Sequence, residues 1–125
     1  MILQTETADF EVGSGEKELR FIFKGKFSEE DCLKATQAWR QYCEENPHEK
    51  FVIIWDCLAM TGFEMSARRE WIKHMQILSN RIASINVVCE NALIRGSARI
   101  VLKLFKFNYK IVKSYDELQS MAEAH

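Results

Sequence analysis

The sequence contains little proline, little glycine and almost no net charge. Its 125 residues include one proline and five glycines, and the formal net charge is -1 at pH 7. No Pro/Gly-rich linker divides the chain, and no field of the whole molecule attracts nucleic acid. No apolar run approaches the roughly 18 residues of a membrane-spanning helix. We therefore expect one soluble domain over residues 1–125 that has no nucleic-acid partner.

Cysteine is sparse as well, and its spacing is irregular. The four cysteines are Cys32, Cys43, Cys57 and Cys89. They form no CxxC pair and match no zinc pattern. The first residues lack the basic and apolar segments of a secretory signal peptide. We predict a cytoplasmic protein with reduced, mostly buried thiols and with no metal or other cofactor.

Catalytic motifs are missing from the sequence. The histidines His48, His74 and His125 lie far apart, and none is close to a cysteine in the chain. No cysteine occupies a recognisable nucleophile turn. We therefore predict a binding protein and not an enzyme.

Short apolar patterns alternate between strand and helix types. Residues 9–13 and 19–27 are typical of two strands that a Gly-Ser-Gly turn joins into a hairpin. Residues 51–55 and 83–89 are continuous apolar runs, typical of strands covered on both faces, and residues 109–112 form a further strand. Helical periodicity and capping residues predict helices over residues 28–46, 66–82, 91–105 and 114–121.

The resulting order, ββαβαβαβα, indicates an α/β fold. We expect a mainly parallel sheet of four to five strands, with an N-terminal β-hairpin and helices packed against the sheet. Such sheets place ligand or partner sites in loops beyond the carboxyl ends of the strands. Here those loops are predicted over residues 56–66 and 90–95.

The first of these loops carries polar and small residues. We single out Asp56, Thr61, Gly62, Glu64 and Ser66. Asp56 either meets a donor of a ligand or accepts hydrogen bonds from loop amides, and the second interpretation is favoured. The free amides of the following helix could hold an anion, but Glu64 would repel phosphate. We therefore predict that Ser66 is the N-cap of this helix.

Two further candidate binding residues lie near helix starts. Arg68 falls in the first turn of the second helix, where the helix dipole disfavours a cation. Asn91 leads into the third helix. Arg68 marks either a binding surface or a solvated side chain, and the second interpretation is favoured.

The third predicted helix is strongly basic on one face. Arg95, Arg99, Lys103 and Lys106 follow at intervals of four, four and three residues, and residues 91–115 contain no Asp or Glu. The rest of the helix is a broad apolar arc. That arc could cover the sheet and still leave surface for an acidic protein, an acyl chain or anionic headgroups. Otherwise the basic face is simply solvated.

Several segments resemble the STAS domains, in particular their SpoIIAA-like branch, which shares its architecture with the CRAL-TRIO domains. The matching residues are Trp55-Asp56, Gly62-Phe63, Ala67-Arg68, Trp71, Arg81-Ile82-Ala83, residues 91–99, residues 109–112 and residues 114–118. The resemblance covers nearly the whole chain.

The resemblance implies a partner-facing surface around the start of the second helix. STAS proteins of anti-sigma pathways carry a phosphorylated serine there, after an aspartate, and this pair falls on Glu64 and Met65. Met65 has no hydroxyl group, whereas Thr61 and Ser66 lie nearby. We predict a non-catalytic protein-interaction or regulatory module, with an amphiphile- or lipid-binding domain as the alternative and a homodimer as one possible assembly.

Overall fold

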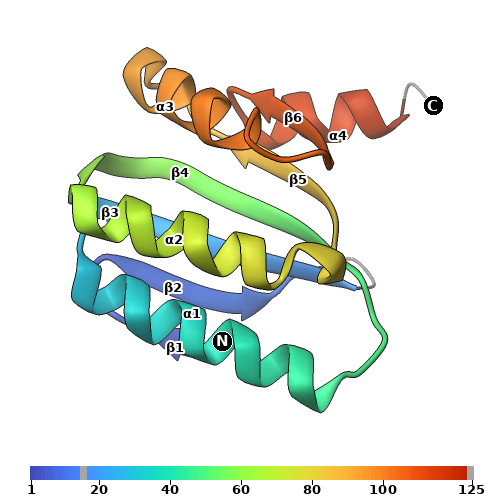
Figure 1. The fold of residues 1–125 in the computed structure, drawn as a ribbon. Coiled ribbons are helices and arrows are strands. Elements are labelled where there is room, and N and C mark those ends of the chain that lie inside the picture. The colour runs from blue at the N-terminus through green and yellow to red at the C-terminus, as the bar shows by residue number, and fades with distance from the viewer. Residues whose placement is uncertain (15–16, 124–125) are drawn as a thin grey trace.

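The computed structural model describes residues 1–14 and 17–123, and these form a six-stranded sheet with four α-helices (Figure 1). The strands are β1 (Leu3–Gln4), β2 (Ala8–Val12), β3 (Glu18–Phe27), β4 (Phe51–Phe63), β5 (Ile82–Val88) and β6 (Asn108–Val112). The helices are α1 (Glu29–Glu45), α2 (Met65–Ile77), α3 (Ala92–Leu102) and α4 (Tyr115–Glu123), and a 3-10 turn (Ser79–Arg81) follows α2.

The strands lie side by side in chain order. β1, β2 and β3 are antiparallel, and β3 to β6 are parallel. This confirms the α/β fold and the N-terminal hairpin, although the predicted turn of that hairpin runs into residues 15–16, outside the described residues. The sheet has one strand more than expected because two residues before the hairpin pair with β2.

The two faces of the sheet are covered by different helices. Alternate strand residues such as Phe21, Ile53 and Val87 are buried under α1, α2 and α3. The opposite face carries a smaller cluster, in which three strand residues pack against α4. Its members are Ile54, Val88, Val112, Tyr115, Leu118 and Met121. Because each parallel crossover is right-handed, the three connecting helices α1 to α3 lie on the same face.

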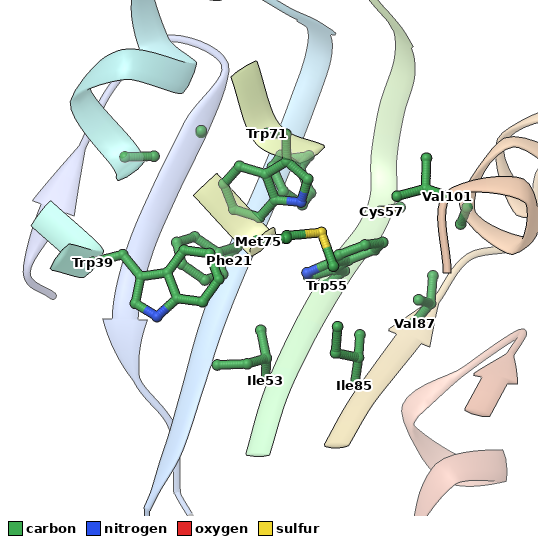
Figure 2. Packing of buried hydrophobic residues seen from close by; sticks show 14 of the residues in the cluster. Phe21, Trp39, Ile53, Trp55, Cys57, Trp71, Met75, Ile85, Val87 and Val101 are labelled. Carbon is green, nitrogen blue, oxygen red and sulfur yellow. The ribbon is translucent and has the colours of Figure 1, made fainter. Parts of the chain in front are cut away.

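Trp71 of α2 is the centre of an aromatic cluster. Its ring centroid lies 4.9–6.1 Å from those of five other rings, contributed by α1, β3 and β4. These rings belong to Phe21, Phe23, Phe27, Trp39 and Trp55. Figure 2 shows Trp71 beside Trp55 and Phe21 in the layer between α2 and the sheet. Large aromatic side chains of this kind dominate the burial of apolar surface.

The prediction of a loop after residue 55 is wrong. β4 continues to Phe63, and it pairs with β3 from Val52 to that residue. The pairing shifts register twice, so β4 contains two more residues than β3 between Asp56 and Phe63. Each such bulge reverses the alternation of side chains. Cys57, Met60 and Phe63, at intervals of three, therefore all face the helices. This irregular spacing is why the segment did not look like a strand.

Three helix boundaries also differ from the predictions. Ser66 is not the N-cap of α2, because helical geometry already begins at Met65 and Glu64 occupies the cap position without a side-chain cap bond. Ile82 begins β5 and does not belong to the second helix. α3 ends at Leu102, before Phe105, and its last residues continue into a turn.

Arg81 fixes the end of α1 against the start of β5. Its guanidinium donates hydrogen bonds to the backbone oxygens of Glu49, at 2.6 Å, and Asn46, and it lies 6.0 Å from the ring centroid of Phe51. The cation thus satisfies carbonyl groups beyond the helix that would otherwise lack partners. It also connects the segment before β4 with the residue that precedes β5.

Replacing Arg81 with methionine should keep the aliphatic stem and remove both charged hydrogen bonds. We expect the free energy of unfolding in urea to fall by about 2 kcal/mol. Arg40→Met, at an exposed position of α1, should change it by less than about 0.5 kcal/mol. Equal stability of the two variants would contradict the anchoring role of Arg81.

Candidate functional site

A groove lies between α2 and α3, above β4. It contains an apolar cavity of about 70 Å³. The cavity is lined by Phe23, Phe27, Trp55, Cys57, Met60, Phe63, Arg68, Trp71, Ile94, Ser97, Ala98 and Val101. We call this region the α2–α3 groove. Trp55 of β4 and Trp71 of α2 are both part of its lining.

The walls of the groove follow from helix and strand periodicity. From α3, Ile94, Ser97, Ala98 and Val101 face the cavity, since intervals of three and four residues share one helix face. The two bulges of β4 bring Met60 and Phe63 to one end. In Figure 2, Cys57 and Val101 lie on the α3 side of Trp55, and Trp71 lies on the α2 side. α3 packs against β4 and β6 and not closely against α2, which leaves the groove open.

Arg68 is the charged residue of the groove lining. Its Nε atom is buried and has no hydrogen-bond partner among the described residues. The guanidinium is always protonated, so this N–H is an unused donor. A buried donor without an acceptor costs about 1–3 kcal/mol. An acceptor group that entered the groove would recover this free energy.

The thiol of the groove is a poor nucleophile. Burial raises the pKa of Cys57, and the neighbouring Cys89 and Asp56 raise it further. Burial also raises the pKa of Cys32, to about 12, and those of Cys43 and Cys89. A neutral thiol reacts slowly. In residues 1–14 and 17–123, no three His, Cys, Asp or Glu side chains are grouped so that they could hold a metal ion.

Asp56 lies on the opposite face of the sheet from the groove. Its Oδ1 accepts a hydrogen bond from the backbone N–H of Leu58 (3.1 Å), and its Oδ2 accepts one from the Tyr115 hydroxyl (2.7 Å). The Arg20 guanidinium lies 5.2 Å from the ring centroid of Tyr115. The interpretation of Asp56 as a carboxylate satisfied by a nearby amide therefore matches its contacts. Its predicted place in a partner-facing loop is wrong, since it lies in β4 beneath α4.

The other candidate residues of the predicted first loop lie outside the cavity lining. Thr61 is exposed and Gly62 is half-buried, and both belong to β4. The carboxylate of Glu64 accepts a hydrogen bond from the backbone N–H of Glu29 (2.7 Å), so it caps α1. Ser66 is half-buried in the first turn of α2. Of this group and Arg68, only Arg68 reaches the groove.

Asn91 caps α3, since its side-chain oxygen accepts hydrogen bonds from the N–H groups of Leu93 (2.9 Å) and Ile94 (3.2 Å). Arg95 is half-buried and Arg99 is exposed, and neither has an ion pair among the described residues. Neither arginine lines the cavity, although both lie on the helix that forms its wall.

The lining residues of α3 and the end of β4 were missed as site residues. The apolar arc of α3 was predicted, but its members Ile94, Ala98 and Val101 were expected to cover the sheet. Ser97 interrupts that arc with a small polar side chain, which is the one sequence signal for a gap there. Nothing in the sequence marks Met60 as a groove residue, because its direction depends on a bulge.

A second, wider depression of about 540 Å³ lies at the start of β5 and the end of α3. It is lined by Ser79, Asn80, Ile82, Ala83 and residues 104–108. It opens broadly to solvent, and Lys106 is the ionisable side chain in its lining. Among the described residues, no helix has the length and apolarity needed to cross a membrane.

The fold matches solved structures at low sequence identity. An uncharacterized protein of the DUF3478 family with a SpoIIAA-like fold, from Shewanella loihica PV-4, is 13% identical, with a TM-score of 0.78 over 97% of this chain and 98% of that one. The anti-sigma factor antagonist SpoIIAA in its unphosphorylated form is 9% identical, with a TM-score of 0.68 over 95% and 100% of the two chains.

No family model and no curated protein matches the sequence. The comparisons therefore confirm the SpoIIAA-like fold that the sequence resemblance implied, and at these identities they show the fold alone.

The Asp56–Tyr115 contact leads to a pH-dependent stability. Burial and the hydrogen bond to Asp56 raise the pKa of Tyr115 above the value of about 10 in the unfolded chain. The folded state therefore keeps the phenol proton where the unfolded state releases it. The stabilisation is fully present below about pH 10 and is lost as the pH rises toward the pKa of the folded state.

Tyr115→Phe should keep the ring beneath Arg20 and lower the free energy of unfolding by about 1–2 kcal/mol at pH 7. The difference between wild type and variant should stay constant from pH 6 to 9 and shrink above about pH 10. Urea unfolding at a series of pH values measures both quantities. A difference that does not change up to pH 11 would show that this phenol does not titrate as described.

Proposed function

We propose that residues 1–125 act as one non-catalytic, regulatory recognition module that binds another protein through the α2–α3 groove. One observation carries the proposal: an open apolar groove that retains an unused, buried hydrogen-bond donor on Arg68. A site of this kind has recognition chemistry but lacks an activated nucleophile or acid–base pair in its lining. The four free cysteines are buried, which suits a reducing compartment such as the cytosol.

The size of the cavity favours a protein partner over a small amphiphile. Pockets for drug-sized ligands usually have volumes of about 300–1,000 Å³, whereas this cavity has about 70 Å³. It has room for part of one side chain and not for an acyl chain. The lipid-binding alternative therefore has no support from this groove.

The surroundings of the groove are also suited to a macromolecule. Exposed apolar side chains extend the apolar surface beyond the cavity on both helices, with Met65 on α2 and Leu93 and Ile100 on α3. Protein interfaces combine such apolar surface with a few central anchors that fill pockets. The fold comparison with an anti-sigma factor antagonist agrees with a regulatory role. Met65 offers no hydroxyl for a phosphorylation switch, so the proposal does not include one.

Filling the groove provides the test. Ser97→Leu should place an isobutyl group in the cavity, raising the free energy of unfolding by about 0.5–2 kcal/mol while blocking the partner. The matched control is Ser120→Leu, at an exposed position of α4. Quantitative affinity purification from the source cells should recover the same proteins with wild type and control, and lose them with Ser97→Leu.

Two measurements keep the result interpretable. Thermal unfolding establishes that Ser97→Leu is folded, so that lost binding reflects the blocked groove. Identical sets of recovered proteins for all three forms would contradict the groove as the binding site.

A further inference from the structure

We propose that the partner segment is an acidic amphipathic helix, which lies along the outer face of α3 and inserts one apolar side chain into the α2–α3 groove. This inference rests on the proposed function and specifies the chemistry of the partner. It is carried by the exposed residues of α3, by the small residues between them and by the charges beside them.

The outer face of α3 carries a row of exposed aliphatic side chains. Leu93, Ile100 and Leu104 have exposed fractions of 83%, 59% and 61%. Leu93 and Ile100, seven residues apart, share one face of α3, and Leu104 follows in the turn after the helix. Single exposed leucines are ordinary on protein surfaces, but a row at helical spacing beside an apolar groove is typical of an interaction site. A partner helix presents its own apolar stripe with the same spacing.

Small residues lie in the middle of this row. Gly96 and Ser97 fall between Leu93 and Ile100, and a Cβ atom added at Gly96 would meet nothing within 4 Å. Its φ angle is in the ordinary range, so the backbone of α3 does not require glycine there. Glycine inside a helix costs about 0.5–1 kcal/mol relative to alanine. Small residues allow a second helix to approach closely, because the side chains at the contact set the interaxial distance.

The charges around the row favour an acidic partner. Arg99 and Lys103 flank it on the side away from the core, and neither has an ion pair among the described residues. No acidic residue occurs between residues 91 and 115 to neutralise them. Arg68 offers its unused Nε donor within the groove. Carboxylates beside the apolar stripe of a partner helix would complement this surface and specify its orientation.

The concave shape favours a helix over a membrane surface. A basic helix with exposed leucines could also lie on anionic lipid. However, the cavity and the Nε atom of Arg68 lie between α2 and α3 and not on the outermost surface. A planar bilayer would leave both unused, whereas a side chain projecting from a partner helix can reach them.

Selection from a displayed library of random peptides tests the inference even while the partner is unidentified. Peptides of about 15 residues, which is four helical turns, are selected on the full-length chain. We expect the selected sequences to share apolar residues at helical spacing together with Asp or Glu. Their affinity, measured by fluorescence anisotropy, should fall about tenfold or more with the double variant Arg99→Glu, Lys103→Glu. Arg40→Glu, on α1, is the control for charge and should not change it.

Gly96→Ala provides an independent variant that we expect to stay folded, because a Cβ atom at this position meets nothing within 4 Å. It should raise the melting temperature, because alanine is the better helix former. It should also weaken peptide binding, because its methyl group enters the contact. Stabilisation with unchanged binding would overturn the close approach of a helix at this point.

The remaining outcomes separate the inference from the proposed function. Selected peptides that lack acidic residues but no longer bind the Ser97→Leu variant would overturn the inference and leave the groove as the binding site. Peptides that are insensitive to Ser97→Leu would overturn the groove itself. A third outcome combines two results: no peptide is selected, and the wild-type protein floats with phosphatidylserine vesicles whereas the Leu93→Ser variant does not. This outcome would overturn the inference in favour of a membrane surface.

Discussion

The packing of the Trp71 indole is the constraint on which the rest of the structure depends. This one side chain contacts aromatic rings from α1, β3 and β4, and so fixes α2 over the centre of the sheet. α3 instead packs on β4 and β6. α2 thus lies over β3 and β4 and α3 lies over β4 and β6, so the two helices stand apart above Trp55. The groove between them is therefore a consequence of the core.

The groove combines three features that lower the stability of the fold. Its lining encloses a cavity, the Nε atom of Arg68 lacks an acceptor, and Gly96 weakens the helix that forms the wall. The cavity, the unpaired donor and the glycine each lower the free energy of unfolding, and a common single substitution would remove any one of the three. Their occurrence together supports the proposed binding role of the groove.

The opposite face of the sheet shows the contrast. There Asp56 accepts hydrogen bonds from the Tyr115 hydroxyl and the Leu58 amide, and the Arg20 guanidinium lies over the Tyr115 ring, although its Nε atom has no hydrogen-bond partner among the described residues. α4 covers the apolar residues beside them. α4 closes this face, whereas the α2–α3 face has the open groove and the exposed side chains of Leu93 and Ile100 on α3.

The sequence by itself determined the α/β architecture, the hairpin and the basic, amphipathic character of α3, because local periodicity encodes each of them. It did not determine that β4 runs on to Phe63, that Asp56 faces α4, or that Met60 faces the groove. These depend on two bulges in the pairing with β3, and a bulge is a property of two strands together. Likewise, the spacing of apolar residues predicted the apolar arc of α3, but only tertiary packing decided that Ile94 is buried while Leu93 is exposed.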